Sequence, residues 1–304
     1  MNEDNIFFKR LSSTEFVYHY TSIEALMSIL EGYRGNRQVA LPFRAGCVYN
    51  SNDPREMELG YKTVKEILPE YEKNSAKNID LSEVFEDEQY ENQCKECFFE
   101  KPKDGLVEVS SVPYAISFSS KRDFLPMWSM YGDNKKGVCL KFNLCSLVSN
   151  LRHLKGKTTQ VCFVHYDGEE NNIILDYLLP VLYDFGNKSI EDTQKMSIAK
   201  KIENLSMLCE CISPFVKSND WAYESEFRLV NHKHYGPVYN EFGNTLNTLK
   251  VERHIIIPIV ANSLEEIITG PLANDVWTHI LLNEFKECGL SNVDISSSNI
   301  KITK

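Results

Sequence analysis

The stretch YESEFRL, residues 223–229, sets the question that this sequence raises. Charged and apolar residues alternate along it, and a period of two is typical of a β-strand, where every second side chain faces the same way. We therefore expect a strand that carries Glu224, Glu226 and Arg228 on one face. Two neighbouring carboxylates repel each other, so this face is either open to solvent or part of a site that uses both charges.

The segments around this stretch predict an α+β fold. Strands are expected at residues 16–19, 114–120, 138–142 and 292–296, and in the runs TTQVCFVHYD, HIIIPIV and LEEIITG. Helical spacing predicts helices after residue 21, after residue 54 and over 273–288. No internal repeat or Gly/Ser linker divides the chain. We therefore expect a single catalytic-type α+β domain over residues 1–304, with a charged insertion near 70–111 and a helical segment near 170–212.

Two capping patterns predict where helices begin. Thr21 stands three residues before Glu24, and Asp53 stands three residues before Glu56. Each pair fits a capping box, in which the two side chains satisfy free amides at a helix start. Gly32 is placed to end the first of these helices. The residues just before Thr21 then lie where a strand meets a helix, a place where folds often present side chains to ligands.

Composition narrows the function classes. The chain has 304 residues, 42% hydrophobic and 25% charged, with a formal net charge of −10. An acidic balance argues against a protein that binds nucleic acid by charge alone, because phosphates need clustered Lys and Arg. The first ten residues lack the apolar core of a secretory signal, and no apolar run approaches membrane-spanning length. We expect a cytoplasmic protein without a membrane partner.

The nine cysteines are expected to be reduced. Cys94 and Cys97 have the spacing of half a zinc site, but Cys209 and Cys211 have the wrong spacing to complete it. We therefore predict no metal. The sequence also lacks a phosphate-binding glycine loop, a GxSxG elbow and an HExxH motif, which argues against the enzyme classes that these motifs mark.

Several residues have both a structural and a functional interpretation. Glu224 and Glu226 fit a solvent-facing strand, or a carboxylate pair in a cleft walled by Trp221 and Tyr223. His19 fits a packed core residue or a ligand contact.

Two further motifs are equally open. Ser117 and Ser119, in SFS, fit backbone-satisfying serines or a pocket wall. Trp128 and Tyr131, in MWSMYG, fit an aromatic plug on the core or a platform on which a ring stacks.

Taken together, the segments YHYTSIEALMSIL, NDPREME, AISFSSKRDFLPMWSMYGDNKKGVCLKF, WAYESEFRLV and LEEIITGP resemble a widespread bacterial family known only as a domain of unknown function. The resemblance runs from about residue 16 to residue 297 and is weaker at 70–111 and 170–212. Some members of that family occur near phage-defence genes. It implies a soluble protein and leaves the activity open.

A more distant resemblance implies a particular enzymatic activity. The order of a His, a strand Ser motif and a strand Glu motif is similar to the ADP-ribosyltransferase superfamily, which implies a split, mixed or antiparallel sheet core. It implies NAD as substrate and Glu226, assisted by Glu224, as catalytic residues. The cofactor-binding residues that it implies are His19, Tyr20, Thr21, Ser117, Ser119, Trp128, Tyr131 and Arg228. Tyr20 stands where the superfamily more often has Gly.

The two resemblances imply a NAD-dependent mono-ADP-ribosyltransferase, a bacterial toxin or anti-phage defence effector that modifies RNA, DNA or a protein. Cleavage of the nicotinamide–ribose bond forms a sugar cation, which a carboxylate pair would stabilise. An antitoxin or chaperone is a possible partner. The alternatives are a non-catalytic nucleotide-binding or sensor module, and a metal-independent RNA-processing enzyme on the same scaffold.

Overall fold

We analysed a computed structural model of the chain. It describes residues 5–35, 40–75, 80–99, 112–151, 159–170, 172–186, 196–232, 239–245 and 248–302. Within these ranges no helix combines the length and the apolar character that crossing a membrane requires.

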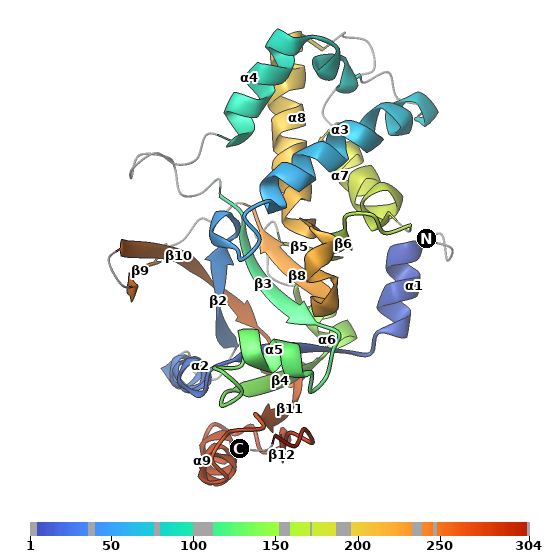
Figure 1. Cartoon of the computed structure of the whole chain (residues 1–304). Helices are drawn as coiled ribbons and strands as arrows, with labels where there is room; N and C mark the ends of the chain where they lie inside the picture. Colours follow the sequence, from blue (N-terminus) through green and yellow to red (C-terminus); the bar gives the residue numbers. More distant parts are fainter. Residues whose placement is uncertain are drawn as a thin grey trace.

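A large mixed sheet forms the centre of the molecule (Figure 1). Its strands are β1 (Phe16–Thr21), β2 (Leu41–Cys47), β3 (Tyr114–Ser119), β4 (Val138–Asn143), β5 (Thr159–Phe163), β8 (Glu226–Asn231), β9 (Tyr239–Thr245), β10 (Thr248–Ile259), β11 (Leu264–Thr269) and β12 (Asp294–Ser297). They are antiparallel except for the parallel pair β11–β12. A second, two-stranded parallel sheet joins β6 (His165–Tyr166) to β7 (Val216–Lys217). The predicted α+β class is confirmed.

The sheet divides at β3. Along one edge β3 pairs with β8 over its whole length. Along the other edge it pairs with β1 only at Ser119, through Tyr18, and with β2 only at Tyr114 and Ala115. The middle of β3 therefore has an edge that neither β1 nor β2 covers, because these two strands diverge there. We call this opening the fork.

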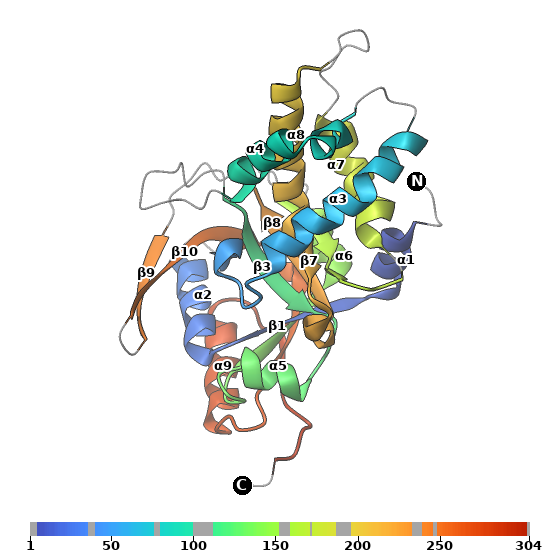
Figure 2. The same ribbon diagram turned by 45° about the horizontal axis from the view of Figure 1, so that its top comes forward.

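Helices lie around the sheet, and some of them form a separate lobe (Figures 1 and 2). The helices are α1 (Ile6–Ser13), α2 (Ile23–Gly35), α3 (Glu56–Asn74), α4 (Glu88–Phe99), α5 (Leu125–Met130), α6 (Leu144–Leu151), α7 (Leu179–Gly186), α8 (Ile198–Ile212) and α9 (Val276–Glu287). Helices α3, α4, α7 and α8 gather into a lobe beyond one end of β3 and β8, and both views show this lobe (Figures 1 and 2). Helix α5 lies near the opposite end of β3.

Three expectations about helix ends are wrong. Helix α2 is capped by Ser22, whose Oγ accepts a hydrogen bond from Ala25 N at 3.1 Å, because Thr21 still belongs to β1. Gly32 lies inside α2, where a side chain would collide with Pro42. Helix α3 begins at Glu56, whose carboxylate does not close a capping box but binds Arg228 of the distant strand β8.

The other predicted elements fall close to their expected positions. Strands β1, β3, β4, β11 and β12 and helix α9 are confirmed within a few residues. The segment near 170–212 contains α7, α8 and the short π-helix η3 (Ile174–Leu178). In the insertion predicted at 70–111, residues 76–79 and 100–111 lie outside the described residues. The remainder holds the end of α3, the short helix η2 (Ser82–Glu86) and α4.

Candidate functional site

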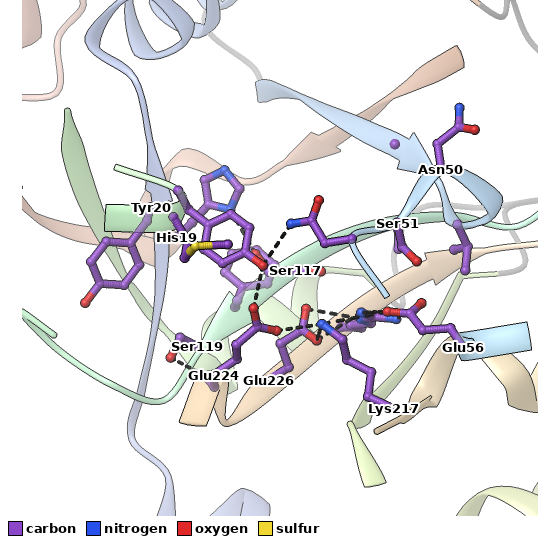
Figure 3. Close-up of a pocket in the computed structure, with 18 of the residues that line it drawn as sticks. His19, Tyr20, Asn50, Ser51, Glu56, Ser117, Ser119, Lys217, Glu224 and Glu226 are labelled. Atoms are coloured by element: carbon purple, nitrogen blue, oxygen red, sulfur yellow. Dashed lines mark hydrogen bonds and ion pairs between the residues drawn. The ribbon is translucent and has the colours of Figure 1, made fainter. Parts of the chain in front are cut away.

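A cavity of about 640 Å³ opens over the fork. Its floor comes from β1, β2, β3 and β8, and its walls come from the loop at residues 50–52, from α5 and from β7 (Figure 3). Most of the residues singled out from the sequence line it. The fork therefore brings together side chains that are far apart in the chain.

Glu224 and Glu226 both reach this cavity, but the prediction that one strand carries them is wrong. Glu224 ends the 3₁₀ helix η5 (Asn219–Glu224), and Glu226 is the first residue of β8. Ser225, between them, has left-handed backbone angles, φ 47° and ψ 58°. This turn breaks the alternation, yet both carboxylates are buried and face the same cation.

That cation is Lys217, at the end of β7. Its Nζ lies 2.6 Å from Oε2 of Glu224 and 3.1 Å from Oε2 of Glu226. It also lies 3.7 Å from Oε1 of Glu56. All four side chains are almost fully buried, so these contacts are poorly screened by solvent. The positive charge of Lys217 offsets the repulsion between the two carboxylates of Glu224 and Glu226. Figure 3 shows its contacts with both.

Arg228 neutralises the same cluster from the other side. Nε and Nη2 donate to Glu226 at 3.2 and 2.9 Å, and Nη1 and Nη2 donate to Glu56 at 3.0 and 2.8 Å. Nη1 also donates to the carbonyl of Pro214 at 2.6 Å. These bonds occupy all of the guanidinium donors. Arg228 lines the cavity, but it acts through Glu226 and Glu56 and has no donor left for a ligand.

The surroundings shift the pKa values of Glu224 and Glu226 in opposite directions. Burial would raise the pKa of Glu226, but Arg228 and Lys217 outweigh it and lower the pKa to about 2. Burial and the nearby charge of Glu226 raise the pKa of Glu224, and Lys217 offsets them only in part. Lys217 stays protonated, since the carboxylates raise its pKa despite burial. Opposed shifts of this kind separate a permanently ionised group from one that can exchange a proton.

Tyr131 links Glu224 to the cavity wall. Its hydroxyl donates a short hydrogen bond to Oε1 of Glu224 and accepts one from Nδ2 of Asn52 at 3.1 Å. Burial, followed by the charge of Glu224, raises the pKa of Tyr131, so the phenol remains a donor. Asn52 and Tyr131 thus form a chain that orients the Glu224 carboxylate.

The two serines of the SFS motif hold the glutamates in different ways. The side chain of Ser117 lies near Glu226 and helps to lower the pKa of its carboxyl. Ser119 Oγ donates to the backbone carbonyl of Glu224 at 2.5 Å and accepts from Lys121 N at 3.0 Å. Ser119 therefore fixes the turn that separates the carboxylates.

His19 fills the fork. Its Nδ1 lies 2.9 Å from the carbonyl oxygen of Ser117, an acceptor that the divided sheet leaves uncovered. A carbonyl only accepts, so Nδ1 carries the proton. The ring packs edge-on against Phe43 at 5.4 Å, and burial lowers the pKa of His19. The imidazole is therefore neutral, and its Nε2 keeps a lone pair for a ligand hydroxyl.

Three of the predicted cofactor-binding residues make contacts within the fold. Trp128 is fully buried, donates to Asp123 at 2.8 Å and does not line the cavity, so the aromatic-plug interpretation applies. Tyr20 packs edge-on against Trp128 at 4.9 Å, and its hydroxyl donates to Lys121 O at 2.7 Å. Tyr20 lines one edge of the cavity, whereas Thr21 ends β1 outside it.

The flanking aromatics and the two candidate metal-binding cysteines are not among the lining residues of the cavity. The Nζ atom of Lys217 lies 5.0 Å from the ring centroid of Trp221, and neither Trp221 nor Tyr223 lines the cavity. Cys94 is buried and Cys97 is exposed, both on α4. Over the described part of the chain, no group of three or more His, Cys, Asp or Glu residues is arranged to hold a metal ion.

Sequence reasoning missed Lys217 and Glu56, which complete the charged cluster. Lys217 ends the apolar run ISPFVK, where a buried cation gives no periodic signal. Glu56 matched a local capping pattern, and its real partner Arg228 is 172 positions away. Only a carboxylate pair in need of a counterion could have suggested a nearby Lys.

Comparison with known proteins leaves the activity open. No curated protein and no solved structure gives a significant match to this chain. The family model described as "Protein of unknown function (DUF2971)" matches residues 127–229. This span is narrower than the resemblance over residues 16–297 that the sequence motifs indicated. It contains Tyr131, Lys217, Glu224, Glu226 and Arg228.

Proposed function

We propose that the protein is a NAD-dependent mono-ADP-ribosyltransferase, acting as a toxin or defence effector on a nucleic-acid or protein acceptor. The observation that carries the proposal is the pair Glu224 and Glu226, joined by one cation in one cavity while their pKa values shift in opposite directions. Group transfer at a sugar carbon needs these two behaviours: a fixed negative charge and a proton acceptor.

Glu226 is the fixed charge. As the bond between C1′ of the ribose and the nicotinamide nitrogen breaks, its electron pair leaves with the neutral nicotinamide and the ribose becomes an oxocarbenium-like cation. Three buried carboxylates face two cations in the cluster, so a negative charge is in excess when all three are ionised. This excess is held in place before the reaction, which favours the cationic transition state over the substrate.

Glu224 is the proton acceptor. The acceptor molecule attacks C1′ with a lone pair, and its proton passes to the Glu224 carboxylate. A raised pKa makes this carboxylate a better base at neutral pH than an ordinary glutamate. Tyr131, itself held by Asn52, donates to Oε1 of Glu224, and Lys217 binds Oε2, so the base is oriented before the acceptor arrives.

His19 and Ser117 would position the ribose. The free Nε2 of a neutral His19 can accept a hydrogen bond from a ribose hydroxyl, and Nδ1 is already fixed by the Ser117 carbonyl. Because the Ser117 side chain also helps to lower the pKa of Glu226, one residue contacts the sugar-binding group and stabilises the charge that acts on the sugar.

A non-catalytic nucleotide-binding module is the second candidate. The observation in its favour is that Arg228 and Lys217 already compensate the charge of Glu226. In such a module Glu226→Gln would weaken the fold and leave ligand binding to correctly folded protein unchanged.

The test uses NAD labelled in its adenosine part and a whole-cell extract. Wild type, Glu226→Gln and a control, Glu265→Gln, are compared after the protein and nucleic-acid fractions are separated. Glu265 pairs with Lys141 outside the cavity. Label transferred by wild type and by the control, but reduced at least about 100-fold in Glu226→Gln, supports the proposal and names the acceptor class. Intact NAD with every extract rejects it.

A further inference from the structure

The cavity has a second charged end, which the proposed chemistry does not use. Arg44 on β2 and His254 on β10 line it together with the acidic cluster. Its acidic lining residues are Glu56, Glu224 and Glu226, and all of them are held by Lys217, Arg228 or Tyr131. The three glutamates of the described lining therefore belong to the Lys217 cluster, and the β2–β10 end contributes Arg44 and His254.

The strand registers place both ends on the same face of the sheet. Gly46 of β2 lies opposite His254 of β10 and opposite Ala115 of β3. Ser117 of β3 lies opposite Arg228 of β8. Side chains two residues apart share a face, so Arg44 projects on the same side as His254, Ser117 and Arg228.

Small residues make the floor between the two ends. Ala115, Ser117 and Gly46 follow one another across β3 and β2, and a Cβ added at Gly46 would meet nothing within 4 Å. Neighbouring strands lie about 4.8 Å apart, so β8 and β10 are separated by about 14 Å across β3 and β2. An extended ligand can lie along this floor with one end beside the acidic cluster and the other beside Arg44 and His254.

We propose that Arg44 and His254 form an anion subsite that holds the phosphate groups of the ligand whose sugar end lies at the acidic cluster. The identification of this ligand as a dinucleotide rests on the proposed function. Guanidinium presents five donors in a fork that matches phosphate oxygens, so Arg44 can bind phosphate alongside another contact. Arg44 is exposed at the cavity rim, where it can attract an anion to a chain whose net charge of −10 would otherwise repel it.

The test measures equilibrium binding of NAD, ADP and nicotinamide riboside, of which the last has no phosphate. Wild type is compared with Arg44→Ala, Arg44→Lys and Arg34→Ala. Arg34 pairs with Glu284 of α9 outside the cavity, so its removal controls for the loss of one positive charge. Gly46→Val is a second, independent variant, because its side chain enters open space and blocks the floor.

We expect Arg44→Ala to weaken the binding of NAD and ADP by about 10- to 100-fold. The binding of nicotinamide riboside should stay within twofold of wild type, and Arg44→Lys should be intermediate for NAD and ADP. Gly46→Val should weaken NAD binding while the melting temperature stays near that of wild type. Added salt should reduce the difference between wild type and Arg44→Ala.

Each outcome separates the subsite from the transferase. Arg44-dependent ADP binding without NAD turnover keeps the subsite and rejects the transferase. NAD and ADP affinities in Arg44→Ala that match those of Arg34→Ala overturn the subsite, as does a wild type that binds neither phosphate compound. An equal loss of nicotinamide riboside binding in Arg44→Ala also overturns it, since that result reports general damage to the cavity.

Discussion

The Nζ atom of Lys217 lies 2.6 Å from Oε2 of Glu224, and this contact holds in place a carboxylate that its neighbour Glu226 would otherwise repel. Both side chains are nearly inaccessible to solvent. Breaking a buried ion pair on one side leaves an uncompensated charge, which is far more costly than losing a surface pair. The stability of the site therefore depends on Lys217.

Replacing Lys217 with Met should lower the free energy of unfolding by about 3–5 kcal/mol at pH 7, as measured by urea titration. The loss should shrink as the pH falls toward 4, because the carboxylates then take up protons and no longer need the cation. Lys200→Met is the control, since Lys200 is exposed and pairs with Glu203 at the surface. It should cost less than about 1 kcal/mol. Equal losses in the two variants would contradict a buried cluster held by Lys217.

Glu226→Gln should change how stability depends on pH. The pKa of Glu226 in the folded state is lowered to about 2, below its unfolded value of about 4.3. Its ionised form therefore stabilises the protein above pH 4.3, and this contribution is lost as the pH falls from there toward 2. At pH 7 the variant should be about 3 kcal/mol less stable than wild type, with the difference closing over that window. A difference that is constant from pH 7 to pH 2 would exclude an ionised, paired Glu226.

Tyr131→Phe should move the acid limb of the transfer rate to higher pH. The Tyr131 hydroxyl donates to Glu224, and this bond lowers the pKa of that carboxyl. Without the bond the pKa of Glu224 rises further, so the base is protonated, and activity is lost, at a higher pH than in wild type. Tyr61→Phe, in the helical lobe, is the control. An unchanged pH profile in Tyr131→Phe would show that Glu224 does not supply the base.

Trp128→Phe should affect folding and leave ligand binding alone. The change removes the hydrogen bond to Asp123 and part of the packing against Tyr20, at an expected cost of about 1–3 kcal/mol. Since Trp128 does not line the cavity, the affinity of the folded protein for NAD should stay within twofold. A tenfold loss of affinity at unchanged stability would restore Trp128 as a stacking platform.

Local patterns in the sequence predicted the elements, and contacts between distant residues decided the site. The strands β1, β3 and β4 could be predicted because apolar alternation is local. The turn at Ser225 could not, since left-handed backbone angles favour glycine and a serine gives no signal for them. The alternation therefore assigned Glu224 to a strand. Of the two interpretations left open, the buried pair in a cavity describes the glutamates, and the solvent-facing strand does not.

The sequence also could not show which aromatic and charged residues face the cavity. Trp128 and Tyr131 are three residues apart, yet only Tyr131 lines it, because the short helix α5 buries one ring and presents the other. Glu56 belongs to the site through its pairing with Arg228, 172 positions away, and its contact with Lys217. The fork that gathers these residues depends on how β1 and β2 share one edge of β3.

The central claim is that the Glu226 carboxylate drives cleavage of the nicotinamide–ribose bond, while Glu224 accepts the proton of the attacking molecule. Its most direct test is release of free nicotinamide from NAD by wild type, Glu224→Gln and Glu226→Gln, with near-ultraviolet circular dichroism to select conditions in which each variant is folded. We predict release by wild type in step with transfer to the acceptor, and a loss of at least about 100-fold in Glu226→Gln. Folded Glu226→Gln that releases nicotinamide at the wild-type rate, or wild type that leaves NAD intact with every extract, would contradict the claim.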